Sequence, residues 1–382
     1  MKKKLLFINN SLYGGGAERI LQTILNNLDI DKYEITLYSV IQEKLEEQYP
    51  QHIKYKYIYK QKQETDSSIY RLYILIYNKL KLLIYKYCSP NLFYRLFIRG
   101  RYDTEIAFIE GYATRIISGS NNKKSKKIAW VHIDLQQNHW TRIAFRNIKE
   151  ENICYKKFNQ ILCVSESVKS NFLKLFPDIH ASTTVCYNPI NDIYIKKQAT
   201  TKMISTNWLK SELTMVTIGR LVPQKGYDRL LPILLKLKKE GYKFSLNILG
   251  EGKERNSLEN FIQKHQLQDI VRLIGFCENP YPYLKNSDLF VCSSRSEGYS
   301  TVITEALILG IPVITTNCAG MNELLESGKY GMITENTDEA LYIGLKRLMD
   351  NPTKIVEYKK LAIQRGTYFT LQNRMIYINN IL

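Results

Sequence analysis

Hydrophobic residues along the chain follow two patterns that alternate. Short apolar runs at 5–8, 128–131 and 289–291 have no polar interruption, which is typical of strands buried on both faces of a parallel sheet. Between such runs, apolar residues recur every three or four positions, as at 20–28, which indicates helices that pack on one face. Because strand and helix patterns alternate along the chain, we expect an α/β protein with parallel sheets.

The length and the pattern together predict two domains. A chain of 382 residues is too long for one ordinary hydrophobic core and suits two domains of similar size. Residues 191–211 show little apolar periodicity and precede a fresh strand, so we expect the linker there. The predicted organisation is a first domain at 1–195, a second at 196–366 and a C-terminal helix at 367–382.

The composition, with 45% hydrophobic and 24% charged residues, is that of a globular protein. No apolar run is long enough to span a bilayer, and the run at 5–8 is too short for a signal peptide. The seven cysteines are scattered without a C-x-x-C spacing, which predicts neither a disulfide framework nor a zinc site. We therefore expect a cytoplasmic protein that is soluble or peripheral.

The formal net charge of +18 is unevenly distributed, since the first 200 residues hold 31 Lys and Arg against 18 Asp and Glu. Such a charge favours contact with anionic lipid or polyanions. The sequence has no pattern of a nucleic-acid-binding motif, so we expect no nucleic-acid partner. Residues 69–101 mix tyrosine and leucine with lysine and arginine, which suits a helix in an anionic membrane interface. An ordinary packed helix pair is the alternative, and both interpretations stay open.

The first candidate for chemistry is the stretch SSRSEGYSTVITEA at 293–306, which predicts a loop that leads from a strand into a helix. Glu297 in the loop and Glu305 in the helix are eight residues apart and can flank one small ligand. Between them, the backbone amides of Ser300, Thr301 and Val302 lie at the helix start, where free N–H groups and the helix dipole favour a phosphate.

Two further loops carry candidate groups. Arg220 and Lys225 lie five residues apart after the strand at 213–218, where two cations can clamp a diphosphate and neutralise its charge without a metal ion. Glycines 14–16 follow the first strand and let a phosphate or sugar approach the backbone. Their spacing is neither G-x-G-x-x-G nor a Walker loop, so it indicates neither a dinucleotide nor ATP.

A histidine and an aspartate, His132 and Asp134, end the apolar strand that begins at Ile128. Ligands of an open parallel sheet bind beyond the carboxyl ends of its strands, which is where both residues fall. A single histidine is more often structural than functional, so the residue pattern alone leaves both roles open.

In its motifs and their order, the chain resembles the retaining GT-B glycosyltransferases, in particular family 4. EGYSTVITEA is similar to the family's Glu-x7-Glu signature, and GGAER, the strand end at His132 and the segment GR-x4-KG at 219–226 resemble its other motifs. The resemblance covers nearly the whole chain. It implies two facing Rossmann-like domains, the acceptor on the first and the nucleotide-sugar on the second, with the last helix crossing back to the first domain.

The resemblance also implies roles for individual residues. His132, Glu297, Arg220 and Lys225 would be catalytic: the two cations stabilise the diphosphate leaving group, Glu297 contacts the donor sugar, and His132 orients that sugar and stabilises developing positive charge. Glu305 would accept hydrogen bonds from the ribose. The expected donor-binding set is Gly15, Gly16, Arg220, Lys225, Gly250, Phe276, Glu297, Gly298, Tyr299, Ser300, Thr301, Val302 and Glu305.

The function expected from the resemblance is retaining sugar transfer from a nucleotide-sugar, with UDP as the default nucleotide, to a lipid-linked saccharide acceptor. The reaction would need no metal and no cofactor. It would serve bacterial surface polysaccharide biosynthesis, such as that of a capsule, with the protein peripheral at the inner face of the cell membrane. Two alternatives remain, a GT-B nucleotide-sugar epimerase and a non-catalytic partner subunit.

Overall fold

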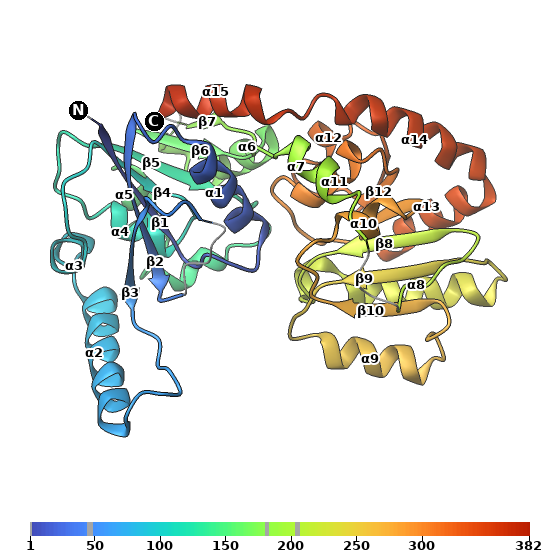
Figure 1. Cartoon of the computed structure of the whole chain (residues 1–382), viewed down its shortest axis with the longest axis horizontal. Coiled ribbons are helices and arrows are strands. Elements are labelled where there is room, and N and C mark those ends of the chain that lie inside the picture. The colour runs from blue at the N-terminus through green and yellow to red at the C-terminus, as the bar shows by residue number, and fades with distance from the viewer. Residues whose placement is uncertain (1, 44–48, 180–182, 203–206) are drawn as a thin grey trace. The chain divides into compact units, whose positions relative to one another are not determined.

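The computed structural model describes residues 2–43, 49–179, 183–202 and 207–382 (Figure 1). The chain divides into two compact units, the first made of Met1–Tyr187 with Met375–Leu382 and the second of Asn188–Arg374. Each unit contains one sheet, and the paired strands in both sheets run parallel. The prediction of an α/β protein with parallel sheets is therefore confirmed.

The sheet of the first unit has the strand order β3-β2-β1-β4-β5-β6-β7. Because the chain order reverses between β1 and β4, the loops after these strands diverge at that point, which is the usual place for a ligand. The strands are β1 (Lys3–Asn9), β2 (Tyr33–Ile41), β3 (Lys54–Tyr59), β4 (Thr104–Ala107), β5 (Lys126–Val131), β6 (Gln160–Cys163) and β7 (Thr183–Val185).

Helices cover this sheet and bury an aromatic core. Phe108 after β4 lies between Phe7 of β1 and Trp130 of β5, with ring centroids 6.3 and 4.9 Å away. All three side chains are fully buried, and aromatic rings of this size supply much of the apolar area that holds a core together. The helices are α1 (Gly16–Asn27), α2 (Ser68–Tyr87), α3 (Pro90–Phe97), α4 (Tyr112–Ile117), α5 (Ile148–Tyr155) and α6 (Glu166–Leu175), with 3₁₀ turns η1 (Trp140–Ile143) and η2 (Pro177–Ile179).

The end of the chain belongs to the first unit. Helix α15 (Leu371–Ile381) presents its last carbonyl groups to the sheet. The Thr104 hydroxyl donates to the Leu382 carbonyl oxygen at 3.1 Å, and Lys126 Nζ donates to that of Ile381 at 2.5 Å. A cation there complements the negative end of the helix dipole. The helix begins at Leu371 and not at residue 367, where the sequence pattern placed its start.

Helix α2 differs from the other helices because it buries little of its surface. The Ser67 hydroxyl caps its start by accepting the Tyr70 N–H at 3.3 Å. Of its 20 residues, the buried ones are Ile74, Lys81 and Tyr85. The helix extends away from the sheet of its own unit (Figure 1). No helix in the described part of the chain is long and apolar enough to cross a membrane.

The sheet of the second unit has the strand order β10-β9-β8-β11-β12-β13, so the chain order reverses between β8 and β11. Its strands are β8 (Thr214–Ile218), β9 (Ser245–Leu249), β10 (Val271–Gly275), β11 (Leu289–Cys292), β12 (Val313–Thr316) and β13 (Met332–Thr334). The helices are α7 (Asp192–Gln198), α8 (Tyr227–Lys239), α9 (Arg255–Lys264), α10 (Tyr281–Lys285), α11 (Thr301–Ile308), α12 (Met321–Leu324), α13 (Asp338–Asp350) and α14 (Pro352–Gly366), with the 3₁₀ turn η3 (Pro223–Lys225).

The linker prediction at 191–211 needs correction. The two units divide after Tyr187, and the predicted linker contains helix α7, whose start is capped by the Asn191 side chain. The helix escaped the sequence pattern because Ile195 is its one buried residue, which leaves no apolar periodicity to detect. Residues 203–206 of the predicted linker lie outside the described residues.

Candidate functional site

Two loops of the second unit carry most of the predicted site. One follows β8 and the other follows β11, and these neighbouring strands are the pair at which the chain order reverses. Ligands of open parallel sheets bind at such a point because the loops diverge there. The structure thus brings the segments 219–226 and 293–300 together at the carboxyl ends of these two central strands.

The central contact between the loops is the ion pair of Lys225 and Glu297, with Nζ and Oε1 2.6 Å apart. The two side chains are 21% and 10% exposed. The Ser294 hydroxyl donates to the same carboxylate oxygen at 2.6 Å. Burial alone would lower the pKa of Lys225, but the carboxylate of Glu297 outweighs it and raises that pKa above its ordinary value. Lys225 is therefore a firmly charged ammonium group.

The predicted partner of Lys225, Arg220, lies on the same loop with its side chain exposed to solvent. The structure places Lys225 against Glu297 and leaves Arg220 at the surface, so the two cations differ in environment. An exposed guanidinium can swing onto a phosphate without losing an internal contact.

Helix α11 begins between the two predicted carboxylates. The Ser300 hydroxyl accepts the Ile303 N–H at 3.4 Å and caps the helix. Glu305 lies on the buried side of α11, 4% exposed, and its Oε1 accepts a hydrogen bond from the Tyr281 hydroxyl at 3.3 Å. Lys225, Glu297, Ser300 and Val302 all line one cavity of about 10 Å³, room for about one water molecule.

Two glycines allow the loops to approach one another. Gly226 has φ +68°, and a Cβ there would meet the Ser293 carbonyl oxygen at 2.2 Å. Gly250 has φ +144°, and a Cβ there would meet the carbonyl oxygen of Gly219 at 2.0 Å. A side chain at Gly226 would push the loop after β8 away from the loop after β11, and one at Gly250 would push it away from the segment after β9. Gly250, a predicted donor-binding residue, thus has a packing role beneath the loop of Arg220.

The other predicted residues of this unit lie nearby in the chain. Gly298 and Tyr299 are buried in the loop after β11, and a Cβ at Gly320 would meet the Gly298 carbonyl oxygen at 2.4 Å. Phe276 directly follows β10 and is 69% exposed. An exposed aromatic side chain at the carboxyl end of a strand has a free face for a planar ring.

In the first unit, the predicted residues also follow neighbouring strands. Gly15 is the N-cap of α1, which starts at Gly16 directly after the loop that leaves β1. Gly14 has φ +92°, and a Cβ there would meet nothing within 4 Å, so its backbone conformation, and not crowding, favours glycine at this position. His132 follows β5, with its imidazole ring 4.9 Å from that of Phe108.

One residue that sequence reasoning missed is Glu110. It follows β4, which lies between β1 and β5 in the sheet. It is 2% exposed and accepts the backbone N–H of His132 at 2.9 Å and the indole N–H of Trp140 at 3.2 Å. Burial raises the pKa of Glu110 to about 7 and lowers the pKa of His132 to about 4. The imidazole is therefore neutral near pH 7. The rule that found His132, a polar residue at a carboxyl strand end, also applies to Glu110.

Asp134 has a local structural role. Its Oδ1 accepts the backbone N–H of Gln136 at 2.9 Å, and its Oδ2 accepts a hydrogen bond from Asn171 Nδ2 at 2.8 Å. The side chain is fully buried. These contacts fix the loop after β5 and give Asp134 no open face for a ligand.

Residues 199–365 match the model of the family described as glycosyl transferases group 1. A Campylobacter jejuni protein, N-acetylgalactosamine-N,N'-diacetylbacillosaminyl-diphospho-undecaprenol 4-alpha-N-acetylgalactosaminyltransferase, is 26% identical over 376 residues, 97% of this chain and 96% of that protein. The solved structure of Anabaena HepE in complex with UDP and glucose superimposes with a TM-score of 0.73 at 18% identity and covers 99% of both chains. The second half of the chain thus resembles the group 1 glycosyl transferases, and the chain has the GT-B fold.

Other relatives match over about a third of the chain. An uncharacterized glycosyltransferase of Methanocaldococcus jannaschii is 36% identical over 143 residues, 34% of this chain and 35% of that protein. An uncharacterized glycosyltransferase of Haemophilus influenzae is 31% identical over 141 residues, 36% of this chain and 40% of that protein. The chain thus spans little more than a third of these two relatives.

The ion pair can be tested through stability. Glu297→Gln leaves Lys225 partly buried without its counter-charge. We therefore expect the free energy of unfolding to fall by about 1–3 kcal/mol, a range that already allows for the reduction of this loss by solvent screening. The double variant Lys225→Met/Glu297→Gln should regain part of this loss because no buried charge remains. Urea titrations at pH 7.5 measure both. The exposed pair Lys243–Glu212 of the same unit, neutralised in the same way, is the control and should cost less than about 1 kcal/mol. If Glu297→Gln were as stable as the wild type, the ion pair would not contribute to stability as expected.

The environment of Glu110 and His132 can be tested through pH. The folded pKa of Glu110 lies near 7 instead of 4.5, so its contribution to stability is lost as the pH rises through that window. The folded pKa of His132 lies near 4 instead of 6.5, so its contribution grows as the pH rises. The two oppose each other in the wild type.

Glu110→Gln removes the first contribution and keeps the second. We expect its free energy of unfolding, relative to the wild type, to rise with pH between 4.5 and 6.5 by up to about 1.4 kcal/mol per pH unit. Urea titrations across this range measure the difference, with the exposed Glu357→Gln as the control. Equal pH slopes in wild type and Glu110→Gln would show that Glu110 titrates normally.

Proposed function

We propose that this protein is a glycosyltransferase that moves a sugar from a UDP-sugar, with retention of the anomeric configuration, to a lipid-linked saccharide in bacterial surface polysaccharide biosynthesis. The observation that carries the proposal is the Lys225–Glu297 pair, which lies with the start of α11 around one cavity at the reversal of strand order. A cation, backbone amides and a fixed carboxylate at one point suit a phosphorylated sugar.

In this proposal, the diphosphate of the donor binds Lys225, Arg220 and the amides of residues 300–302. The cations neutralise the charge that develops on the leaving group, so the step needs no metal and no cofactor. Glu305 accepts hydrogen bonds from the ribose, and Phe276 lies close to the base. UDP is the nucleotide in the HepE complexes, and for the present chain it is part of the proposal.

The sugar itself is proposed to contact Glu297 and His132. Because Lys225 and Ser294 both bind Oε1 of Glu297, the carboxylate suits a fixed hydrogen-bond acceptor better than a nucleophile. This supports attack from the same face as the departing diphosphate, which retains the configuration. The neutral imidazole of His132 supports its proposed role, because a protonated ring would repel positive charge that develops on the sugar.

The acceptor is proposed to bind the first unit and to be linked to a lipid. The name of the Campylobacter jejuni relative includes diphospho-undecaprenol, and that relative matches over 97% of this chain. Two relatives with shorter matches, from Salmonella typhimurium and Escherichia coli, are named putative colanic acid biosynthesis glycosyltransferases. A polysaccharide pathway, capsule included, is therefore the proposed setting.

A lipid-linked acceptor places the enzyme at a membrane, and helix α2 supports a peripheral contact with the inner face. Residues 67–102 hold seven Lys or Arg and no Asp or Glu. Tyr70, Tyr73 and Tyr77 stack along one side of α2, with ring centroids 6.1 and 5.9 Å apart. The exposed large hydrophobic residues of α2 are Ile69, Tyr70, Leu72, Tyr73, Leu75, Ile76, Tyr77, Leu80, Leu82, Leu83 and Tyr87.

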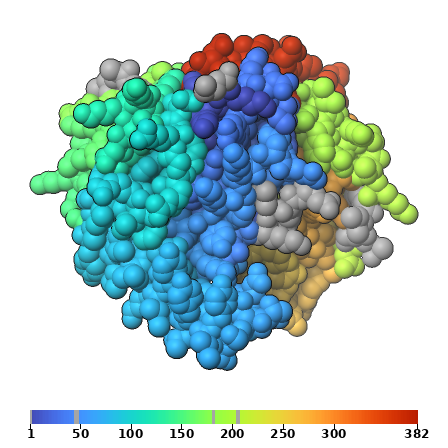
Figure 2. Space-filling model, turned by 60° about the vertical axis from the view of Figure 1, so that its left-hand side comes forward, coloured from blue at the N-terminus to red at the C-terminus, as the bar shows by residue number. Residues whose placement is uncertain are grey.

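This combination of exposed apolar, tyrosine and basic side chains suits the interface of an anionic bilayer. Figure 2 shows the light-blue surface that includes α2 at the bottom of the view. A helix that only packed on its own unit would bury a continuous apolar stripe, and α2 buries only two hydrophobic residues, Ile74 and Tyr85.

Turnover tests the transferase proposal. With a polyprenyl-diphosphate-linked saccharide and a matching UDP-sugar, the wild type should release UDP and form a bond with the donor's anomeric configuration, read by NMR. Glu297→Gln should lower kcat/KM by about a hundredfold, because a charge-assisted contact to the sugar is lost. Glu357→Gln, on the exposed side of α14, is the control. UDP release with donor alone and a changed sugar would instead indicate an epimerase.

Vesicle flotation tests the membrane contact. The wild type should float with vesicles that contain phosphatidylglycerol and much less with pure phosphatidylcholine, because basic residues near an anionic surface each contribute about 1 kcal/mol. Leu72→Ser/Ile76→Ser/Leu83→Ser should lose most of this binding while keeping its far-UV circular dichroism. Ile343→Ser/Val356→Ser, two exposed apolar residues of the second unit, is the control. Unchanged flotation of the α2 variant would contradict the contact.

A further inference from the structure

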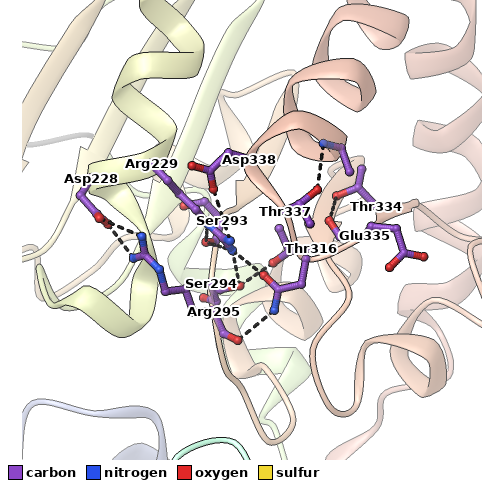
Figure 3. Close-up of polar contacts among 12 residues, drawn as sticks. Asp228, Arg229, Ser293, Ser294, Arg295, Thr316, Thr334, Glu335, Thr337 and Asp338 are labelled. Atoms are coloured by element: carbon purple, nitrogen blue, oxygen red, sulfur yellow. Dashed lines mark hydrogen bonds and ion pairs between the residues drawn. The ribbon is translucent and has the colours of Figure 1, made fainter.

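A buried arginine lies directly behind the loop that carries Glu297. Arg229 is in the first turn of α8, and the residue is 6% exposed. Its Nε and Nη2 donate to the Ser293 carbonyl oxygen at 2.9 and 2.7 Å, and Nη2 donates to that of Ser294 at 2.7 Å. Figure 3 shows the guanidinium among these contacts. Because carbonyl oxygens surround the charge, the energetic cost of burying it is met by charge-assisted hydrogen bonds.

Other groups besides Arg229 also hold the backbone of Ser294 in place. The Ser294 carbonyl oxygen also accepts from the Thr316 hydroxyl at 2.5 Å and from Cys318 Sγ at 3.2 Å. The Ser294 side chain in turn donates to Glu297 Oε1 at 2.6 Å. A fixed backbone at Ser294 therefore fixes the hydroxyl that orients the carboxylate of Glu297.

A second branch runs through Asn336, which precedes α13. Its Oδ1 accepts from Arg229 Nη2 at 2.8 Å, and its Nδ2 donates to the Arg295 carbonyl oxygen at 2.9 Å. Three consecutive carbonyl groups, at 293, 294 and 295, are thus held by Arg229 directly or through Asn336. The Arg295 side chain of the same loop forms an ion pair with Asp228 of α8. Because both side chains are exposed, this pair contributes little to the stability of the loop.

We propose that Arg229 is a positioning residue that holds Glu297, through Ser294, in the orientation that contacts the sugar of the donor. The inference rests on the proposed function, in which Glu297 contacts that sugar. Arg229 itself is not proposed to touch nucleotide or sugar, because its guanidinium already binds the loop carbonyl groups and the Asn336 side chain and pairs with the Asp338 carboxylate, 3.8 Å from Nη1. Replacing Arg229 should therefore reduce the ratio of the affinity for a UDP-sugar to the affinity for UDP. Replacing a residue that is needed only for folding should not change this ratio.

The matched pair of variants is Arg229→Lys and Arg365→Lys. Arg365 is a second buried arginine of the same unit, 8% exposed, and it too binds carbonyl oxygens, those of Glu323 and Leu324. A lysine cannot reproduce the planar fork at either place, so both variants lose comparable stability. Only Arg229 is connected to Glu297, so only Arg229→Lys should lose the sugar-dependent part of donor affinity.

Calorimetric titration with UDP and with UDP-glucose, UDP-N-acetylglucosamine and UDP-N-acetylgalactosamine measures this part. For the UDP-sugar that the wild type prefers, Arg229→Lys should lose about three- to tenfold of the preference over UDP, and Arg365→Lys none. Ser294→Ala should lose a similar share, and the double variant should lose no more than either single variant, because both act through one contact.

A second readout needs no nucleotide. Competitive acetylation with mass spectrometry reports how well Glu297 covers Lys225, and the Lys225 rate should rise about threefold or more in Arg229→Lys but not in Arg365→Lys. Equal Lys225 rates and equal sugar preference in the two variants would overturn the inference. If no UDP species binds the wild type, the proposed function fails, and the acetylation rates alone decide whether Arg229 positions Glu297.

Discussion

The site depends on one partly buried ion pair, Lys225 with Glu297, formed between two loops that leave neighbouring strands in the middle of a parallel sheet. A charge in this position is stable only if its partner is held close, because removing either one leaves the other partly desolvated. The carboxylate and the ammonium group therefore fix one another, and they fix both loops. This arrangement suits chemistry that needs a cation and a carboxylate at a fixed distance from each other.

The loops reach this contact because the surrounding backbone lets them. Gly226 and Gly250 have no side chain at positions where a carbonyl oxygen of a neighbouring segment lies close to the backbone. The buried guanidinium of Arg229 binds the carbonyl groups of Ser293 and Ser294 in the loop after β11. In the first unit, Glu110 plays a comparable structural part by binding the backbone of His132. A buried polar residue thus holds each of the two in place: Glu110 binds the backbone of His132, and Arg229 binds the backbone of Ser294, whose hydroxyl binds Glu297.

The sequence predicted the parallel sheets and the loops after β8 and β11, because apolar runs and glycines report strands and tight turns locally. It did not reveal Glu110 or Arg229, whose partners lie 22 and 64 residues away along the chain. Long-range contacts of this kind leave no periodic signal. The linker prediction was wrong for a related reason, since α7 buries a single residue and shows no helical pattern. The roles of His132, Glu297 and Glu305 on a donor stay predictions.

The most direct test of the central claim is calorimetric titration of UDP into the full-length protein in the presence of EDTA. If Lys225 binds the diphosphate in place of a metal ion, the wild type binds UDP under these conditions, and Lys225→Gln binds it about tenfold or more weakly. Lys243→Gln, at an exposed lysine of the same unit, binds as the wild type does. Binding that requires a divalent cation, or equal affinity in Lys225→Gln, would contradict the account.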